Sequence, residues 1–204
     1  GKRLFRMKKS KSILVWYGLN NQGAEKIAKR LKNVNFRIPI GISAAKSNVT
    51  EDFILEESIA DYMKTYTEFA DIGHYTTLNI SCPNTRDGEP FALKENLQPL
   101  CEAVRKNHVP GRPVYVKLAA DLSREELEDT LDVVMDNKDV IQGVVLTNLA
   151  KPAGEGGKEI KGDLAYHKGG MSGLPVQRLA TTMIRDTYRY TGGEITIIGV
   201  GGVF

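Results

Sequence analysis

The sequence lacks the features that mark secreted, membrane-spanning and metal-centred proteins. Its 204 residues contain only two cysteines, Cys82 and Cys101, and neither has a neighbour at metal-ligand spacing. No signal peptide is visible, and no apolar run approaches the ~18 residues that a membrane span needs. We therefore expect no disulfide framework and no metal site, and a reducing compartment is favoured.

An excess of charge of one sign is also missing. The chain has 28 Lys and Arg against 25 Asp and Glu, which gives a net charge of +3. This excess is too small to predict a nucleic-acid partner. One basic cluster lies at the start of the chain, and we expect it to be a solvated terminal arm rather than a contact with a membrane or polyanion. Its members are Lys2, Arg3, Arg6, Lys8, Lys9 and Lys11.

Strand-like and helix-like segments alternate along the chain. Apolar runs such as Val144–Leu146 are typical of buried parallel strands, and the helical segments carry apolar residues at helical spacing. The predicted strands are 35–42, a strand ending at Asn79, 113–118, 141–147 and 195–200; the predicted helices are 51–70, 94–107, 123–137 and 175–190. This α/β alternation predicts a parallel sheet, in either a closed (β/α)₈ barrel or an open doubly wound fold. No Gly-x-Gly-x-x-Gly follows an early strand, so a dinucleotide-binding fold has little support.

Polar residues gather where the predicted strands end. They are Ser43 and Lys46, then Asn79, Cys82 and Asn84, then Lys117, and then Thr147 and Asn148. In parallel α/β folds the carboxyl ends of the strands are where chemistry is placed. Each residue taken singly has an equally good explanation as a loop, cap or surface residue. Lys117 differs, because a lysine inside an apolar strand is costly to bury unless an anion lies near it.

Two glycine-rich segments predict a phosphate site. Gly199–Gly202 follows the last strand, and Gly169–Gly173 leads into a helix with Pro175 in its first turn. Helix N-termini bind anions through free N–H groups, and (β/α)₈ barrels commonly bind phosphate at their last two strands. The loop 151–173 has the length of a lid rather than of a simple connection.

Seven motifs extend these observations to a family. They are 17–23 (YGLNNQG), 79–85 (NISCPNT), 116–119 (VKLA), 146–148 (LTN), 151–154 (KPAG), 169–173 (GGMSG) and 197–203 (IIGVGGV). In this order the chain resembles the dihydroorotate dehydrogenases, specifically the quinone-linked class 2 branch. The resemblance implies one FMN-binding (β/α)₈ TIM barrel domain over residues 1–204, incomplete here and holding about strands 3 to 7. Because the chain begins with Gly1 and stops just after an apolar strand, we expect truncation at both ends and an inactive fragment.

The resemblance also implies roles for individual residues. Cys82 stands at the position of the base that removes a proton while hydride leaves for the flavin, as dihydroorotate is oxidised to orotate in pyrimidine (UMP) biosynthesis. Substrate would be bound by Asn79, Asn84 and Asn148. The cofactor FMN would be held by Ser43, Asn79, Lys117, Thr147, Ser172, Gly173, Gly201 and Gly202.

The chain departs from the family pattern at four positions. Cys82 replaces the serine usual in class 2 and matches class 1, while Val15, Ser43 and Leu149 replace two asparagines and a threonine. Two alternatives therefore stay open: another FMN-dependent barrel oxidoreductase acting on a related cyclic amide, or a non-catalytic flavin-binding remnant. The class 2 resemblance further implies quinone as electron acceptor, a cytoplasmic location, and peripheral contact with the inner membrane through segments outside this chain.

Overall fold

The computed structural model describes residues 2–47, 53–81, 89–151 and 169–203. Its centre is a parallel sheet of five strands, formed by β3 (Gly41–Ala44), β4 (Tyr75–Asn79), β5 (Val114–Leu118), β6 (Gly143–Leu146) and β8 (Thr196–Gly199). The strands are paired in the order β3-β4-β5-β6-β8, so neighbours in the sheet follow one another along the chain. The parallel sheet that the alternation predicted is confirmed.

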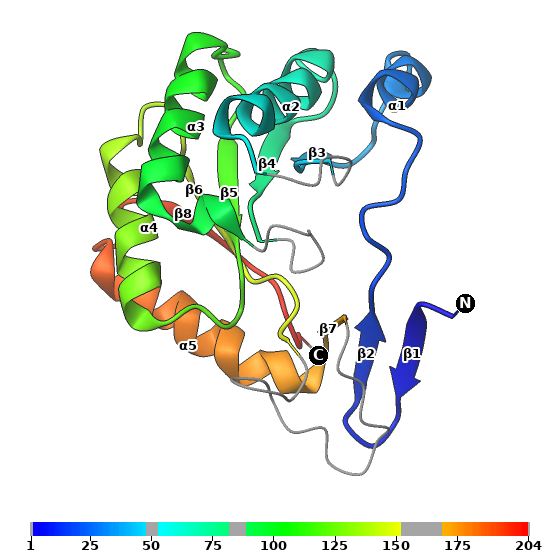
Figure 1. Ribbon diagram of the computed structural model, residues 1–204, viewed down its shortest axis with the longest axis vertical. Helices are drawn as coiled ribbons and strands as arrows, with labels where there is room; N and C mark the ends of the chain where they lie inside the picture. Colours follow the sequence, from blue (N-terminus) through cyan, green and yellow to red (C-terminus); the bar gives the residue numbers. More distant parts are fainter. Residues whose placement is uncertain (1, 48–52, 82–88, 152–168, 204) are drawn as a thin grey trace.

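Helices cover one side of this sheet. They are α1 (Ala24–Leu31), α2 (Leu55–Glu68), α3 (Lys94–Lys106), α4 (Arg124–Asp136) and α5 (Leu174–Tyr190), with a short 3₁₀ helix, η1 (Pro90–Ala92), before α3. Figure 1 shows them in an arc around the outside of the curved sheet. This arrangement is that of part of a (β/α)₈ barrel. None of the helices in the described part of the chain has both the length and the apolar character that a membrane crossing requires.

The main core lies between the sheet and α2, α3 and α4. On α3, Leu97, Leu100, Cys101 and Val104 are fully buried, and their spacing places them on one face of the helix. The helix α4 begins at a capping box: Ser123 Oγ accepts from the Glu126 backbone amide at 3.2 Å, and the Ser123 backbone amide donates to Glu126 Oε2 at 2.7 Å. The helices α3 and α4 lie within one residue of the predicted ranges, whereas α2 begins four residues later and ends two residues earlier than the predicted range 51–70.

Two predictions about the first 45 residues are wrong. The strand predicted over 35–42 is β3, which covers Gly41–Ala44, while 35–40 lies outside any regular element. The basic side chains are exposed to solvent, as predicted, but the segment is a hairpin and not an arm: β1 (Leu4–Met7) pairs antiparallel with β2 (Ser12–Val15). The helix α1 was not predicted. The strands β1, β2 and β3 have four residues each, which is too short for alternation to distinguish a strand from a loop, and the helix α1 has only eight residues.

The hairpin is joined to a segment far away in sequence. The strand β2 pairs antiparallel with the two-residue strand β7 (Gly170–Met171), which makes a second sheet of order β1-β2-β7. Its buried side packs Met7, Leu14 and Met171 together, and Phe5 stacks on Trp16 with ring centroids 5.2 Å apart. In Figure 1 this small sheet lies on the side of the molecule away from α3 and α4.

Candidate functional site at the carboxyl edge of the sheet

Strand register brings two of the predicted site residues side by side. Asn79 of β4 is the register partner of Lys117 of β5, which in turn pairs with Val145 of β6 and, through it, Ile198 of β8. Val116 and Leu118 point into the core below the helices, so Lys117 faces the opposite, inner side of the sheet. Lys117 and Asn79 therefore lie together on the face that a barrel turns inward, near the carboxyl ends of their strands.

A hydrogen-bonded chain joins the ends of β4 and β6. Ser81 Oγ donates to Asn79 Oδ1 at 3.1 Å. Asn148 Nδ2 donates to two oxygens of Ser81, the backbone carbonyl and, at 3.1 Å, the side-chain Oγ. The backbone N–H of Asn148 donates to the carbonyl of Leu118 at 2.8 Å, so the end of β5 is hydrogen-bonded to the same residues. Ser81 is buried and was not singled out in the sequence, although it stands between the predicted residues Asn79 and Cys82. It is the residue that fixes the two carboxamides relative to each other.

Thr147 lies between this group and the glycines that follow β8. Its amide donates to the Val200 carbonyl at 2.8 Å, and its Oγ1 donates to the Asn148 carbonyl at 2.9 Å. A Cβ on Gly201 would lie 3.7 Å from Thr147 Oγ1 and 3.0 Å from Val176 Cγ1 of α5. Thr147, Gly201 and the start of α5 thus meet at one place.

The two glycine-rich segments converge at the N-terminus of α5. Gly173 caps the helix with φ 78°, and Gly202 has φ 64°. A Cβ on Gly202 would lie 2.8 Å from the Gly173 carbonyl oxygen and 2.6 Å from Gln177 Cβ, so the two backbones touch where no side chain fits. Ser172 borders the same place, and its hydroxyl donates to the Ile13 carbonyl at 3.3 Å. At the start of α5 the Leu174 amide donates to the Lys11 carbonyl, the Val176 amide donates to the Gly173 carbonyl, and Pro175 has no N–H. The bare glycine backbone at Gly201 and Gly202 is therefore the part of this place that suits an anionic oxygen group.

Ser43 lies further from this centre. It pairs with Thr77, two residues before Asn79, on the exposed edge strand β3. With Lys46, which is buried, it lines a hollow of about 610 Å³ between the loop 18–23, α1 and α2. Ser43 therefore shares the inner face with Asn79 and Lys117 but lies one layer below them.

Cys82 and Asn84 lie outside the described residues. The other cysteine, Cys101, is fully buried in the core of α3, as expected, and burial raises the pKa of its thiol to about 12. A thiol with that pKa is protonated near neutrality, so Cys101 has no role as a base or nucleophile.

A group of charged residues beside the site was not predicted. Burial raises the pKa of the Glu89 carboxyl, whose Oε1 has no hydrogen-bond partner among the described residues. The Nζ of Lys151 lies 3.9 Å from Asp121 Oδ2, and the positive charge of Lys151 partly opposes the rise in the Glu89 pKa. No three His, Cys, Asp or Glu side chains of the described ranges come together as a metal site.

Comparison with known proteins accounts for this arrangement. The family model described as "Dihydroorotate dehydrogenase" matches residues 2–204. The chain belongs to the dihydroorotate dehydrogenase family. Proteins named "Dihydroorotate dehydrogenase (quinone)" from Thermosynechococcus vestitus and Myxococcus xanthus are each 35% identical to it over 208 residues. These alignments cover 99% of this chain but only 56% and 54% of the two relatives, so the chain spans about half the length of the curated relatives it matches.

Solved structures support the fold independently. A dihydroorotate dehydrogenase (DHODH) from Eimeria tenella, crystallised with ferulenol, superimposes with a TM-score of 0.80 at 23% sequence identity. The superposition covers 99% of this chain and 59% of that one. The fold is thus part of the (β/α)₈ barrel of the dihydroorotate dehydrogenases, as the motifs predicted.

Two departures from the family pattern have a structural setting. Leu149 follows Asn148, and its side chain lies where a Cβ on Gly170 would be, 2.5 Å from Leu149 Cβ. Val15 pairs with Leu4 on one side and with Gly170 on the other. Both residues thus pack around Gly170, where β2, β7 and the segment after β6 meet.

Proposed function

We propose that the protein is an FMN-dependent enzyme that oxidises dihydroorotate to orotate in pyrimidine (UMP) biosynthesis and passes the electrons to a quinone. One observation carries the proposal: Asn79, Lys117, Thr147 and Asn148 gather at one edge of the sheet beside a glycine-lined helix N-terminus, in a chain of this family. The relatives named above supply the substrate and the acceptor by their names. A location at the cytoplasmic face of the inner membrane belongs to the same proposal.

The residues present fit FMN. The bare backbone at Gly201, Gly202 and Gly173, together with Ser172, would hold the phosphate. Lys117 would place its positive charge beside the ring, and Thr147 would contact it from β6. Ser43 would contribute from the edge strand. When bound, FMN supplies the hydride acceptor.

The substrate contacts follow from the hydrogen-bonded chain. Asn79 uses its Oδ1 to accept from Ser81, and its Nδ2 has no partner among the described residues, so this amide is left to donate to a ligand oxygen. Asn148 is held by Ser81 and by the Leu149 amide, which donates to its Oδ1 at 2.9 Å. Fixed carboxamides orient a cyclic amide substrate with little entropic cost. Asn84 would add a third carboxamide.

Cys82 is proposed as the base that removes the proton of dihydroorotate. Its ordinary thiol pKa of ~8.5 is nearer to neutrality than that of a serine hydroxyl, so a neighbouring positive charge suffices to populate the thiolate. Cys101 provides an internal contrast, because its burial keeps it protonated.

The proposal is tested by steady-state orotate formation with a quinone acceptor, using the protein in its native length. Cys82→Ala should retain flavin and lose turnover by roughly 10²–10⁴-fold, the range of general base catalysis. Cys101→Ala is the matched control and should keep the turnover of each folded molecule. Near-normal turnover in Cys82→Ala would show that Cys82 is not the base.

Two alternative functions are separated by flavin reduction. A panel of dihydropyrimidines and other cyclic amides, mixed anaerobically with the flavin-loaded protein, identifies the substrate by bleaching of the flavin absorbance. Faster bleaching by another cyclic amide would favour a different barrel oxidoreductase. A flavin that none of the panel reduces would favour a non-catalytic remnant.

A further inference from the structure

The hydroxyl of Ser81 is bonded differently from the hydroxyls that support the helical layer. Thr130 in α4 and Thr191 just after α5 are buried, and each donates to a backbone carbonyl one helical turn earlier, at 2.8 and 2.9 Å. Ser81 is 2% exposed, and its Oγ bonds two side chains instead: it donates to Asn79 Oδ1 and accepts from Asn148 Nδ2, both at 3.1 Å. Most side-chain hydrogen bonds in proteins are made to backbone or water, so a buried hydroxyl placed between two carboxamides needs an explanation.

This one hydroxyl decides which end of each carboxamide is left for a ligand. A carboxamide has one oxygen and one NH₂ group, and turning it over exchanges acceptor and donor at nearly the same place. The single proton of the Ser81 hydroxyl goes to Asn79 Oδ1, so the NH₂ group of Asn79 points away from Ser81 and has no partner among the described residues. The NH₂ group of Asn148 donates to Ser81 Oγ and to the Ser81 carbonyl, while its Oδ1 accepts from the Leu149 amide. Ser81 therefore orients Asn79 as a donor and Asn148 as an acceptor.

The backbone on both sides of Ser81 is held as well. The hydroxyl of Tyr62, a buried residue of α2, donates to the Asn79 carbonyl at 3.0 Å. The Ser81 carbonyl that accepts from Asn148 belongs to the peptide bond between Ser81 and Cys82, the proposed base. These contacts join α2, the end of β4 and the end of β6, and the residues that make them are buried or half-buried within this chain. Ser81 thus lies at the centre of a group whose hydrogen bonds are internal to the chain.

We propose that Ser81 is a positioning residue for the oxidation of dihydroorotate, because its hydroxyl sets the orientation in which Asn79 and Asn148 meet the substrate. The inference rests on the proposed function and adds to it a residue that acts through the two carboxamides. The proton and one lone pair of the hydroxyl are already used within the protein. A carboxamide that is free to turn offers a mixture of two orientations, and a small misplacement of the reacting groups costs up to about 100-fold in rate.

The test compares two variants of the flavin-loaded protein in its native length. Ser81→Thr keeps the hydroxyl and Ser81→Val replaces it by a methyl group, so the crowding caused by the larger side chain is common to both. Anaerobic flavin reduction by dihydroorotate should be on the order of 100-fold slower in Ser81→Val than in Ser81→Thr. Reoxidation of the reduced flavin by quinone does not involve the carboxamides, and its rate should differ by less than about twofold between the two variants.

A matched control removes a buried hydroxyl that only supports the fold. Thr130→Val keeps the shape of the side chain and loses the bond to the Glu126 carbonyl in α4, so flavin reduction by each folded molecule should equal that of the wild type. A purely structural role for Ser81 would lower the amount of folded, flavin-loaded protein in Ser81→Val in the same way. It would leave both half-reactions of the loaded molecules unchanged.

A second readout reports the orientation of the carboxamides without the reaction. In protein labelled with ¹⁵N in its asparagine side chains, the NH₂ resonances of Asn79 and Asn148 should shift in Ser81→Val and stay near their wild-type positions in Ser81→Thr. The resonance of Asn107, which bonds the Ala103 carbonyl on α3, should not move in either variant. Failure of dihydroorotate to reduce the wild-type flavin would overturn the proposed function. Equal flavin reduction in the two variants, or unshifted Asn79 and Asn148 resonances in Ser81→Val, would overturn the role of Ser81 instead.

Discussion

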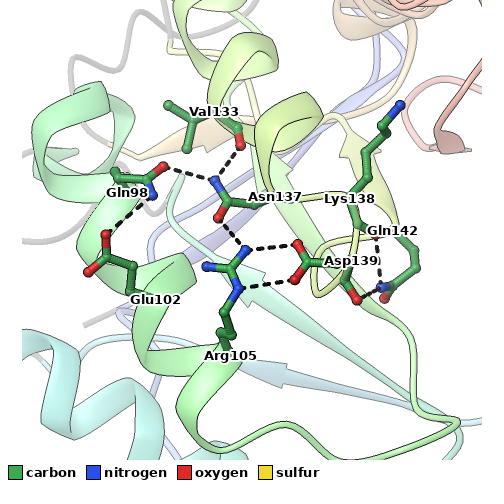
Figure 2. Close-up of polar contacts among 8 residues, drawn as sticks. All are labelled: Gln98, Glu102, Arg105, Val133, Asn137, Lys138, Asp139 and Gln142. Atoms are coloured by element: carbon green, nitrogen blue, oxygen red, sulfur yellow. Dashed lines mark hydrogen bonds and ion pairs between the residues drawn. The ribbon is translucent and has the colours of Figure 1, made fainter.

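Two asparagine-centred networks lie at opposite edges of the same sheet, and they differ in how completely their hydrogen bonds are used. At the amino edge, Asn137 is buried and donates to the Gln98 Oε1 and the Val133 carbonyl, both at 2.8 Å, while its Oδ1 accepts from Arg105 at 3.0 Å. Figure 2 shows this network, which joins α3 to the connection between α4 and β6. At the carboxyl edge, Asn79 keeps Nδ2 without a partner among the described residues.

The difference in hydrogen bonding indicates that the Asn137 network serves the stability of the fold and the Asn79 network serves function. A saturated buried carboxamide holds its neighbours in one arrangement, since leaving any partner unpaired would be costly. A carboxamide that is held on one side and left with a donor on the other is prepared for a ligand. Barrel enzymes assign these roles to the same two edges. Substitutions at the two networks should therefore separate loss of turnover from loss of stability.

The largest effect is expected at the carboxyl edge. Lys117→Met should lower turnover at least ~100-fold, because the charge beside the proposed flavin ring is lost. The free energy of unfolding should change by less than about 1 kcal/mol, since the methionine keeps most of the apolar stem. Steady-state kinetics and urea denaturation measure the two quantities on one preparation. A large loss of stability with unchanged turnover would place Lys117 in the scaffold.

The opposite pattern is expected for Asn137→Ala. The three hydrogen bonds of a buried carboxamide are lost, although Arg105 keeps its bonds to Asp139, so the free energy of unfolding should fall by about 2–4 kcal/mol. Turnover of the molecules that remain folded should stay within twofold of the wild type. The control Asn107→Ala removes one bond from its Nδ2 to the Ala103 carbonyl at an exposed helix end, and should cost below about 1 kcal/mol. Equal losses in the two variants would contradict the special position of Asn137.

A smaller effect tests whether all residues near the carboxyl edge are functional. Ser123 begins α4 just after β5 and only caps the helix through Glu126. Ser123→Ala should lower the free energy of unfolding by about 1 kcal/mol and leave turnover unchanged, as expected for loss of an N-cap. Chemical denaturation and the orotate assay check both statements. A fall in turnover beyond the loss of folded protein would extend the site to α4.

The smallest effect is expected at the exposed part of the amino-edge network. Arg105 bonds both oxygens of Asp139, at 2.8 and 3.0 Å, and this hydrogen bonding holds the pKa of the Asp139 carboxyl below its usual 3.8. A lowered pKa in the folded state means that the stabilisation is present above pH 3.8 and is lost as the pH falls through the folded value. Asp139→Asn should therefore be slightly less stable than the wild type at pH 7, and the difference should disappear in acid and shrink with salt. A difference that persists in acid would be due to packing.

Elements with strong local patterns were predictable. The apolar spacing of α3, the capping box of α4 and the apolar runs of β5 and β6 each specify an element without reference to the rest of the molecule. The hairpin β1–β2 was not predictable, because its strands are four residues long and gain their packing from Met171, more than 150 residues away. The burial of Arg112 was not predictable either. Its hydrogen-bond partners are the Thr76 hydroxyl and the carbonyls of Phe69 and Ala70 just after α2, which lie more than 30 residues away in the sequence.

The sequence by itself determined the family, the α/β alternation and the chemical types at the strand ends, because motifs and periodicity are local properties of the chain. Only the tertiary structure decided which of these residues meet. Strand register placed Asn79 beside Lys117, Ser81 joined Asn79 to Asn148, and backbone contact brought Gly202 to Gly173. The same register turned a basic segment into a hairpin with one packed and one exposed face. Such contacts depend on side-chain packing between distant segments, which no local pattern encodes.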